Sequence, residues 1–306
     1  MNMADKYFGV SVSIKVCRDW GINDLKVIDF AHTELNIKHF RLMSYWDEIE
    51  KSPGKYNFKY LDEQFKAIEQ FGGRVTLAIG KRQPRWPECH MPEWALILDK
   101  DEWYKRLFIF IRKVVERYKN SPALISYQLE NEALLKNFGD CKDGDYSRKR
   151  LKTELKIISN IDKKHPVIMS LSNNWGFPIL GPFPDIFGIS LYRVSYSNGK
   201  YSRSIFPVWW YKLRARIVRL YSKKPVFIHE LQAEPWGPRA NHEMERAEQL
   251  KSMNIKQLET NINFARKTNL YPVFLWGLEW WYANKNDHEF VARLKDIFKE
   301  LEYSDN

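Results

Sequence analysis

Two glutamates carry the most specific chemical signal in the sequence, because each follows a short run of apolar and β-branched residues. Glu132 follows the run Leu124–Leu129, and Glu230 follows the run Pro225–His229. If both runs are parallel strands that end at the same edge of a sheet, the two carboxyl groups can face each other. Hydrolysis of a glycosidic bond needs such a pair, one carboxyl protonated and the other ionised. A separation of about 5–5.5 Å would indicate retention of configuration, and about 6.5–9.5 Å would indicate inversion.

Three other glutamates lie near the same predicted strand ends. Glu130 precedes Glu132 by two residues, so the alternation of a strand places both on one side and does not choose between them. Glu234 lies beyond the strand in the run Glu-Pro-Trp-Gly, which favours a loop contact. Glu279 is either a substrate ligand or a structural carboxylate paired with an arginine, and the sequence leaves both roles open.

The histidines do not indicate a metal. His90, His165 and His229 do not have the spacing of zinc ligands, so we expect each to be a structural, hydrogen-bonded histidine. Neither a metal nor a cofactor is expected.

The elements that must position these residues alternate between strand-like runs and longer helical patterns, which is typical of a parallel sheet. Eight runs are predicted as strands: Tyr7–Ile14, Ile37–Met43, Arg74–Ile79, Leu124–Leu129, Pro166–Leu171, Ile186–Leu191, Pro225–His229 and Pro272–Trp276. Helices are expected at or near Asp24–Leu35, Leu61–Phe71, Trp103–Tyr118, Tyr146–Ile161, Val208–Tyr221, Glu245–Lys267 and Glu289–Leu301. The connection Ser172–Asp185 has no clean helical period and is expected to hold a shortened helix.

Eight strands with intervening helices predict a single (β/α)₈ TIM barrel, an α/β fold that would occupy residues 1–306. The competing doubly wound sheet usually carries a glycine-rich phosphate turn after its first strand. Here that turn reads Lys15-Val16-Cys17-Arg18-Asp19-Trp20, without a glycine. The barrel is therefore favoured.

At the predicted strand ends the sequence resembles glycoside hydrolase clan A, the retaining group that includes families five, thirty-five and forty-two. The clan pattern is an Asn-Glu pair ending the fourth strand and a Glu ending the seventh, and Asn131, Glu132 and Glu230 match it. The run QLENE, residues 128–132, looks like the fourth-strand signature of family thirty-five β-galactosidases. Residues 40–58 resemble the second-strand region of several clan members, and the resemblance extends from Phe8 to Tyr282.

The resemblance implies a role for each matching residue. Glu132 would be the acid/base, Glu230 the nucleophile, and Asn131 a ligand of the sugar 2-hydroxyl. Arg41 would keep the nucleophile ionised, and Tyr192 would donate a hydrogen bond to it. Either Trp280 or Trp276 would form the floor of the subsite for the sugar on the non-reducing side.

Aromatic residues support a carbohydrate substrate, because sugar rings stack on aromatic side chains and the chain has 12 Trp and 16 Tyr. Trp46, Trp86, Trp175 and Trp236 lie in predicted loops and indicate several sugar subsites, hence an oligo- or polysaccharide. For Trp46 and Trp86 a structural role in a long loop is an equal alternative.

The bulk properties limit other functions. The net charge of +11 is explained by the solvated faces of outer helices, so no nucleic-acid partner is expected. The basic, aromatic run Phe206–Tyr221 could lie on a membrane surface, but a barrel helix with its apolar face inward is preferred. Cys17, Cys89 and Cys141 are an odd number without Cys-x-x-Cys spacing, which argues against a disulfide framework.

The N-terminus lacks the apolar core of a signal peptide, and no apolar run approaches the ~20 residues of a membrane span. A soluble monomer is expected, with its compartment left open because a trimmed signal or anchor would be invisible.

The leading hypothesis is a retaining glycosidase that acts on β-linked hexosides of glucan or mannan type. An exo-acting β-galactosidase and a transglycosylase are alternatives that use the same residues. A non-catalytic carbohydrate-binding barrel is the alternative from another class, and it predicts that one carboxylate is absent or displaced.

Overall fold

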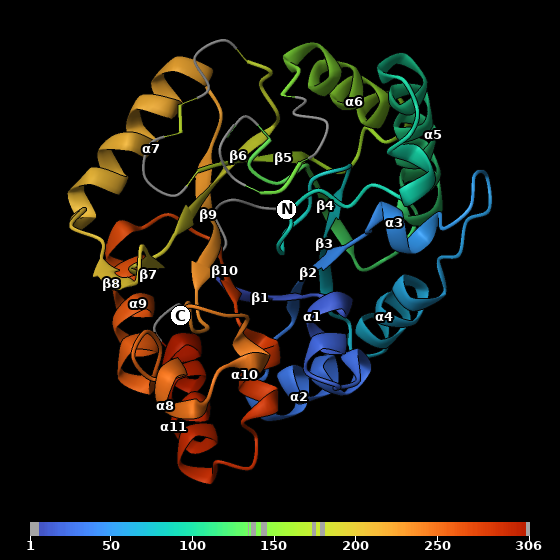
Figure 1. Ribbon diagram of the computed structural model, residues 1–306. Coiled ribbons are helices and arrows are strands. Elements are labelled where there is room, and N and C mark those ends of the chain that lie inside the picture. Colours follow the sequence, from blue (N-terminus) through green and yellow to red (C-terminus); the bar gives the residue numbers. More distant parts are fainter. Residues whose placement is uncertain are drawn as a thin grey trace.

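The computed structural model describes residues 6–133, 135, 139–141, 146–172, 176–177 and 181–303; Trp175 lies outside them. Eight parallel strands form a closed barrel in the order β1-β10-β9-β6-β5-β4-β3-β2. Figure 1 shows the helices as an outer ring around it. The predicted TIM barrel is confirmed. The barrel strands are β1 Phe8–Val12, β2 His39–Met43, β3 Arg74–Ile79, β4 Leu124–Leu129, β5 Val167–Leu171, β6 Ile186–Leu191, β9 Val226–Gln232 and β10 Val273–Trp276.

Each predicted strand run corresponds to one barrel strand, with shifts of a few residues at some ends. Side chains alternate between the two sides of the sheet, because successive residues of a strand point in opposite directions. In β2, Phe40 and Leu42 belong to the large apolar core that holds the helices, while Arg41 bonds Gln128 inside the barrel. The barrel interior is therefore polar where it approaches the mouth.

Four of the outer helices begin where a polar side chain caps the first turn. Asn23, Asp99, Ser147 and Asn254 each accept a hydrogen bond from the backbone N–H three residues later. The long helices are α2 Asp24–Leu35, α4 Lys59–Gln70, α5 Lys100–Tyr118, α6 Arg148–Ile161, α7 Val208–Ser222, α9 Ile255–Thr268 and α11 His288–Tyr303.

One predicted helix is divided. Residues 245–267 form a short helix, α8 Arg246–Gln249, and then α9, because Asn254 caps a new helix in the middle of the predicted one. Between β5 and β6 the described residues contain no helix, so the shortened helix expected within Ser172–Asp185 is not found among them.

Short elements at the strand ends were not predicted, because they lie in the loops that surround the barrel mouth. They are α1 Ile14–Asp19, α3 Trp46–Ile49, α10 Leu278–Ala283, the 3₁₀ turns Glu93–Ala95 and Asn241–Glu243, and the antiparallel hairpin of β7 Val194–Ser197 with β8 Lys200–Arg203.

The expectation of no disulfide was wrong. Cys89 and Cys141 form one, 52 residues apart, while Cys17 is free and buried. Counting cysteines could not reveal the pair, because the barrel brings the loops after β3 and β4 together. Across the described residues, no helix is both long and apolar enough to cross a membrane.

Candidate active site

Glu230 lies on β9 at the barrel mouth and is fixed by two neighbours. Arg41 Nη1 is 2.6 Å from Glu230 Oε2, and Tyr192 Oη donates a hydrogen bond of 2.8 Å to Glu230 Oε1. The pairing of β9 with β6 shifts register between Ile189 and Ser190, so that Ser190 lies opposite Glu230. The Glu230 carboxylate is therefore held at the mouth. Its Oε2 is paired with the Arg41 guanidinium, and its Oε1 accepts a hydrogen bond from the Tyr192 hydroxyl.

Glu132 follows β4 and is held by two serines. Its backbone N–H donates to Ser170 Oγ at 2.7 Å, and Ser190 Oγ donates to Glu132 Oε1 at 2.8 Å. Burial, and then the charge of Glu230, raise the pKa of Glu132 to about 7. Ser190 thus joins the two glutamates: it is the β6 partner of Glu230 and the donor to Glu132. One carboxyl is held as an ion pair, and the other is held protonated up to neutral pH.

Asn131 is fixed on both sides of its amide. Its Oδ1 accepts from Gln128 Nε2 at 3.1 Å and from Arg41 Nη2 at 3.3 Å. Its Nδ2 donates to Glu88 Oε2 at 2.8 Å. Arg41 also donates through Nε to Gln128 Oε1 at 2.7 Å. One network therefore orients Asn131 and Glu230 together.

Glu88 is a site residue that sequence reasoning missed. It is buried, and burial together with the charges of Glu230 and Glu132 raises its pKa well above the usual range. It lies in a long loop after β3 with a left-handed backbone, φ 73°, so no strand period indicates where its side chain points. In the sequence, the one feature that could have pointed to Glu88 is its position next to Cys89.

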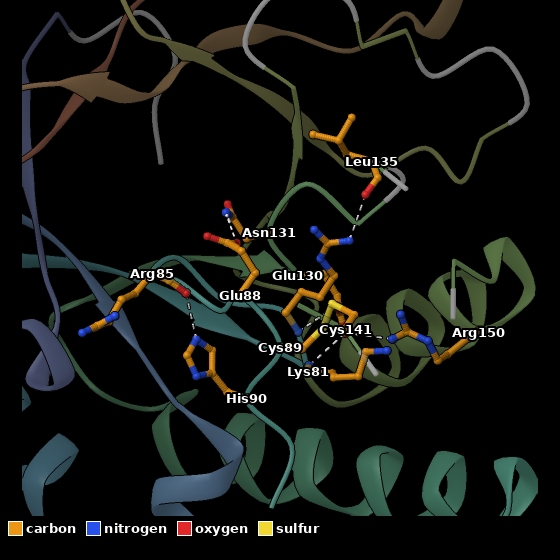
Figure 2. The surroundings of a disulfide bond; sticks show 11 residues. Lys81, Arg85, Glu88, Cys89, His90, Glu130, Asn131, Leu135, Cys141 and Arg150 are labelled. Carbon is orange, nitrogen blue, oxygen red and sulfur yellow. Dashed lines mark hydrogen bonds and ion pairs between the residues drawn. A yellow bond between two sulfur atoms is a disulfide. The ribbon is translucent and has the colours of Figure 1, made fainter. Parts of the chain in front are cut away.

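A disulfide holds the Glu88 loop against the loop after β4 (Figure 2). Cys141 is bonded to Cys89, the residue after Glu88, and Asp140 N–H donates to Pro87 O at 2.9 Å. A Cβ added to Gly139 would lie 2.8 Å from the Cβ of Glu88, so the two loops pack closely here. We call Glu88, Cys89, Gly139, Asp140 and Cys141 the inter-loop clamp.

Glu130 does not share a side with Glu132, contrary to the period-two prediction. The strand ends at Leu129, and Glu130 and Glu132 adopt left-handed backbones with φ 55° and 44°. Glu130 accepts from the backbone N–H of Lys81 and of Arg82, both at 2.9 Å, and pairs with Arg150 at 2.8 Å. It is a buried structural carboxylate (Figure 2).

Two further carboxyls lie near Trp276, at the end of β10. Trp276 Nε1 donates to Glu234 Oε1 at 2.8 Å, and Glu279 Oε1 accepts from the backbone N–H of Ser13 at 2.6 Å. Burial and the charge of Glu279 raise the pKa of Glu234 to about 8. Burial raises the pKa of Glu279 to about 7. Glu234 thus makes a contact from the loop after β9, and Glu279 is bonded to backbone rather than to an arginine.

The predicted aromatic ligands divide into two groups. Trp46 and Trp280 are completely buried: Trp46 packs on Phe110 and donates to Glu50, and Trp280 donates to Gln249. A side chain inside the core cannot stack on a sugar, so these two assignments are corrected. Trp276 is also buried, at 7% exposure, and its role as the subsite floor stays a prediction. Trp86 is 61% exposed and Trp236 is 36% exposed, so both are available to a ligand.

The histidines differ from one another. His165 bonds Asp162 at 2.7 Å, and His90 is bonded to the carbonyl of Arg85 at 3.2 Å. His229 is buried, which lowers its pKa well below the usual range, and a backbone hydrogen bond with Ile189 opposes this shift. A structural role for His229 stays a prediction. No group of three or more His, Cys, Asp or Glu among the described residues could hold a metal ion.

Curated relatives match part of the chain. The β-galactosidase Pbg of Clostridium perfringens is 28% identical over 130 residues, which cover 37% of this chain and 18% of that protein. The β-galactosidase GanA of Bacillus subtilis is 27% identical over 137 residues, covering 39% and 19%. The matched region thus spans about a fifth of the length of these relatives. No protein-family model matches the chain.

Solved structures match most of the chain. A GH5_18 protein from Bifidobacterium longum subsp. infantis superposes with a TM-score of 0.63 at 16% identity, covering 89% of this chain and 69% of that one. Endo-glycoceramidase II from Rhodococcus sp., in its ganglioside GM3 complex, gives 0.59 at 14% identity, covering 89% and 73%. The chain has the fold of the TIM-barrel glycosidases, and its likeness to these proteins confirms the resemblance to glycoside hydrolase clan A.

Proposed function

We propose that the chain is a retaining glycoside hydrolase of β-linked hexosides, with Glu132 as acid/base and Glu230 as nucleophile. The observation that carries the proposal is that the two carboxyl groups have different electrostatic environments. Glu230 is ion-paired with Arg41, whereas burial and Glu230 itself raise the pKa of Glu132 to about 7. An attacking carboxylate and a proton-donating carboxylic acid are the two groups that double displacement needs.

In the first step Glu230 Oε attacks the anomeric carbon while Glu132 transfers its proton to the leaving oxygen, so that the glycosidic bond breaks. The product is a glycosyl ester of Glu230 with Glu132 ionised. In the second step Glu132 removes a proton from water, the water oxygen attacks the anomeric carbon, and Glu230 leaves as a carboxylate. A sugar hydroxyl in place of water would give transglycosylation.

The substrate is proposed from the residues around this pair. Asn131 offers its amide to the sugar 2-hydroxyl, and Trp276 offers an indole face to the ring. Exposed Trp86 and Trp236 are candidates for further subsites, which supports a glucan- or mannan-type oligosaccharide. β-Galactosides belong in the same test because the curated relatives named above are β-galactosidases.

The test is hydrolysis of aryl β-glucosides, β-mannosides and β-galactosides and of the matching oligosaccharides, with the product anomer followed by NMR. Wild type should release the β-anomer first from at least one substrate, and Glu230→Ala should be inactive. Release of the α-anomer would contradict retention. Oligosaccharide binding without any cleavage would instead favour the non-catalytic sugar-binding barrel.

A further inference from the structure

The segment from the start of β6 to His229 in β9 has an unusual charge distribution. From Ile186 to His229 the chain contains nine Lys and Arg and no Asp or Glu. The whole of α7 lies in this segment, at the periphery of the ring of helices (Figure 1). The basic residues are Arg193, Lys200, Arg203, Lys212, Arg214, Arg216, Arg219, Lys223 and Lys224.

The inner face of α7 packs on the barrel as expected, through Tyr211, Ala215 and Val218. Its outer face is also apolar. Trp209 is 62% exposed and Leu220 is 61% exposed, and Leu213 and Ile217 lie between them on the same face of the helix. Large apolar residues that form a continuous exposed stripe are uncommon unless the stripe contacts something.

The stripe extends beyond the helix at both ends. Ile205, just before α7, is 89% exposed. At the other end, exposed Tyr221 packs edge-to-face on exposed Phe183, with ring centroids 5.7 Å apart. We call Ile205, Trp209, Leu213, Ile217, Leu220, Tyr221 and Phe183 the apolar stripe.

A basic row runs beside the apolar stripe. Lys212, Arg216, Arg219 and Lys223 recur every three to four residues and are all exposed, so they share one side of the helix. Arg219 and Lys223, the last residues of this row, also line a cavity of about 560 Å³ at the C-terminal end of α7. Lys6 and Lys224 line the same cavity. Asp185 Oδ1 lies 3.9 Å from Lys224 Nζ.

We propose that the apolar stripe, the basic row and this cavity form a docking surface for a membrane that contains anionic phospholipid. The apolar side chains would enter the interface between headgroups and acyl chains, where a helix with Trp and Leu beside Lys and Arg binds. The basic row would attract the negative lipid surface, and the cavity would accept a headgroup phosphate. Lipid phosphates supply the negative charge that this acid-free segment lacks.

The experiment is co-sedimentation of the whole chain with vesicles of phosphatidylcholine alone and of phosphatidylcholine mixed with phosphatidylglycerol. At about 0.1 M salt, the mixed vesicles should bind about tenfold more protein than the neutral ones. Equal binding to both, or binding to neither, would overturn the proposal.

Variants separate the two components of the surface. Trp209→Ser with Leu213→Ser, and separately Lys212→Glu with Arg216→Glu, should each reduce binding to mixed vesicles about tenfold or more. The matched control is Lys149→Glu with Lys152→Glu, which changes the net charge equally on the exposed side of α6 and should bind as wild type does. A control variant that loses as much binding would show that net charge alone is responsible, against the proposal.

Two measurements distinguish other occupants of the same surface. Inorganic phosphate should compete only weakly; if millimolar phosphate removes all vesicle binding, the cavity is an ion site and the docking surface is wrong. Light scattering should show the same mass for wild type and Trp209→Ser/Leu213→Ser. A wild-type dimer that this variant dissociates would assign the stripe to a second copy of the chain and refute the proposal.

Discussion

At the scale of single residues, Glu130 and Glu132 are only two positions apart, yet their surroundings shift their pKa values in opposite directions. Glu130 is surrounded by donors, so Arg150 and Lys81 lower its pKa against the effect of burial. Glu132 has Ser190 as its donor and the negative Glu230 nearby, so its pKa rises to about 7. The left-handed backbones of both residues separate the two side chains.

This difference predicts opposite effects of the same substitution. Glu130→Gln leaves Arg150 in the core without its full counter-charge and should reduce the free energy of unfolding by ~3–5 kcal/mol. Glu132→Gln should leave unfolding nearly unchanged and reduce kcat about 10²–10⁴-fold on poor leaving groups. Denaturant unfolding and kinetics of both variants provide the check. If Glu130→Gln is as stable as wild type but inactive, Glu130 is the catalytic carboxyl and Glu132 the structural one.

The pH dependence of hydrolysis follows from the same residue. On the proposed mechanism Glu132 must be protonated to assist the leaving group, so kcat/KM should fall as pH rises through about 7. Ser190→Ala removes a hydrogen bond that favours the ionised form of Glu132. The pKa of Glu132 should then rise, and the alkaline limb of the pH profile, where kcat/KM falls, should move to higher pH. A limb that stays in place in Ser190→Ala would mean that another group controls it.

At the scale of elements, the inter-loop clamp positions Asn131 through Glu88. Glu88→Ala removes the acceptor of Asn131 Nδ2, whereas Glu88→Gln keeps an acceptor oxygen there. On the proposed mechanism, Glu88→Ala should lower kcat/KM about 10–100-fold for a 2-hydroxy glycoside and much less for its 2-deoxy analogue. Equal losses for both substrates would indicate a general structural defect instead.

Strand ends could be predicted from the sequence, whereas loop contents could not. Apolar runs such as Arg74–Ile79 and Leu124–Leu129 are strands with the predicted bounds, because burial on both faces imposes a continuous apolar pattern. Glu132 and Glu230 follow such runs, so both could be located. Glu88 lies in a loop without periodicity, and its contact with Asn131 depends on a left-handed backbone and a disulfide.

Aromatic residues were predicted least well, for a related reason. Trp46 and Trp280 lie in short helices at the mouth, α3 and α10, whose inner faces complete the core. A tryptophan after a strand has the same appearance in sequence whether it faces the ligand or the core. Burial, which decides between the two, depends on contacts between distant segments, such as that of Trp46 with Phe110.

At the scale of the whole molecule, the Cys89–Cys141 disulfide limits the freedom of the unfolded chain. A cross-link between residues 52 apart contributes about 4 kcal/mol in the chain-entropy account. Reductant should therefore lower the midpoint of thermal unfolding by several degrees, measured by calorimetry. Cys141→Ser should show a low midpoint that reductant does not change. An identical midpoint in wild type with and without reductant would contradict the bond.

The polar interior of the barrel has an evolutionary consequence. Arg41 bonds Gln128, Asn131 and Glu230, three residues from two other strands and the loop that follows one of them. On the proposed mechanism, a change at any one of them would disturb catalysis and packing together, so single substitutions there would rarely be tolerated. At the rim, Trp86 is 61% exposed and less constrained, whereas Trp236 packs edge-to-face on Tyr192, the donor to Glu230. Divergence toward new sugars would therefore begin in the loops while the interior stays constant.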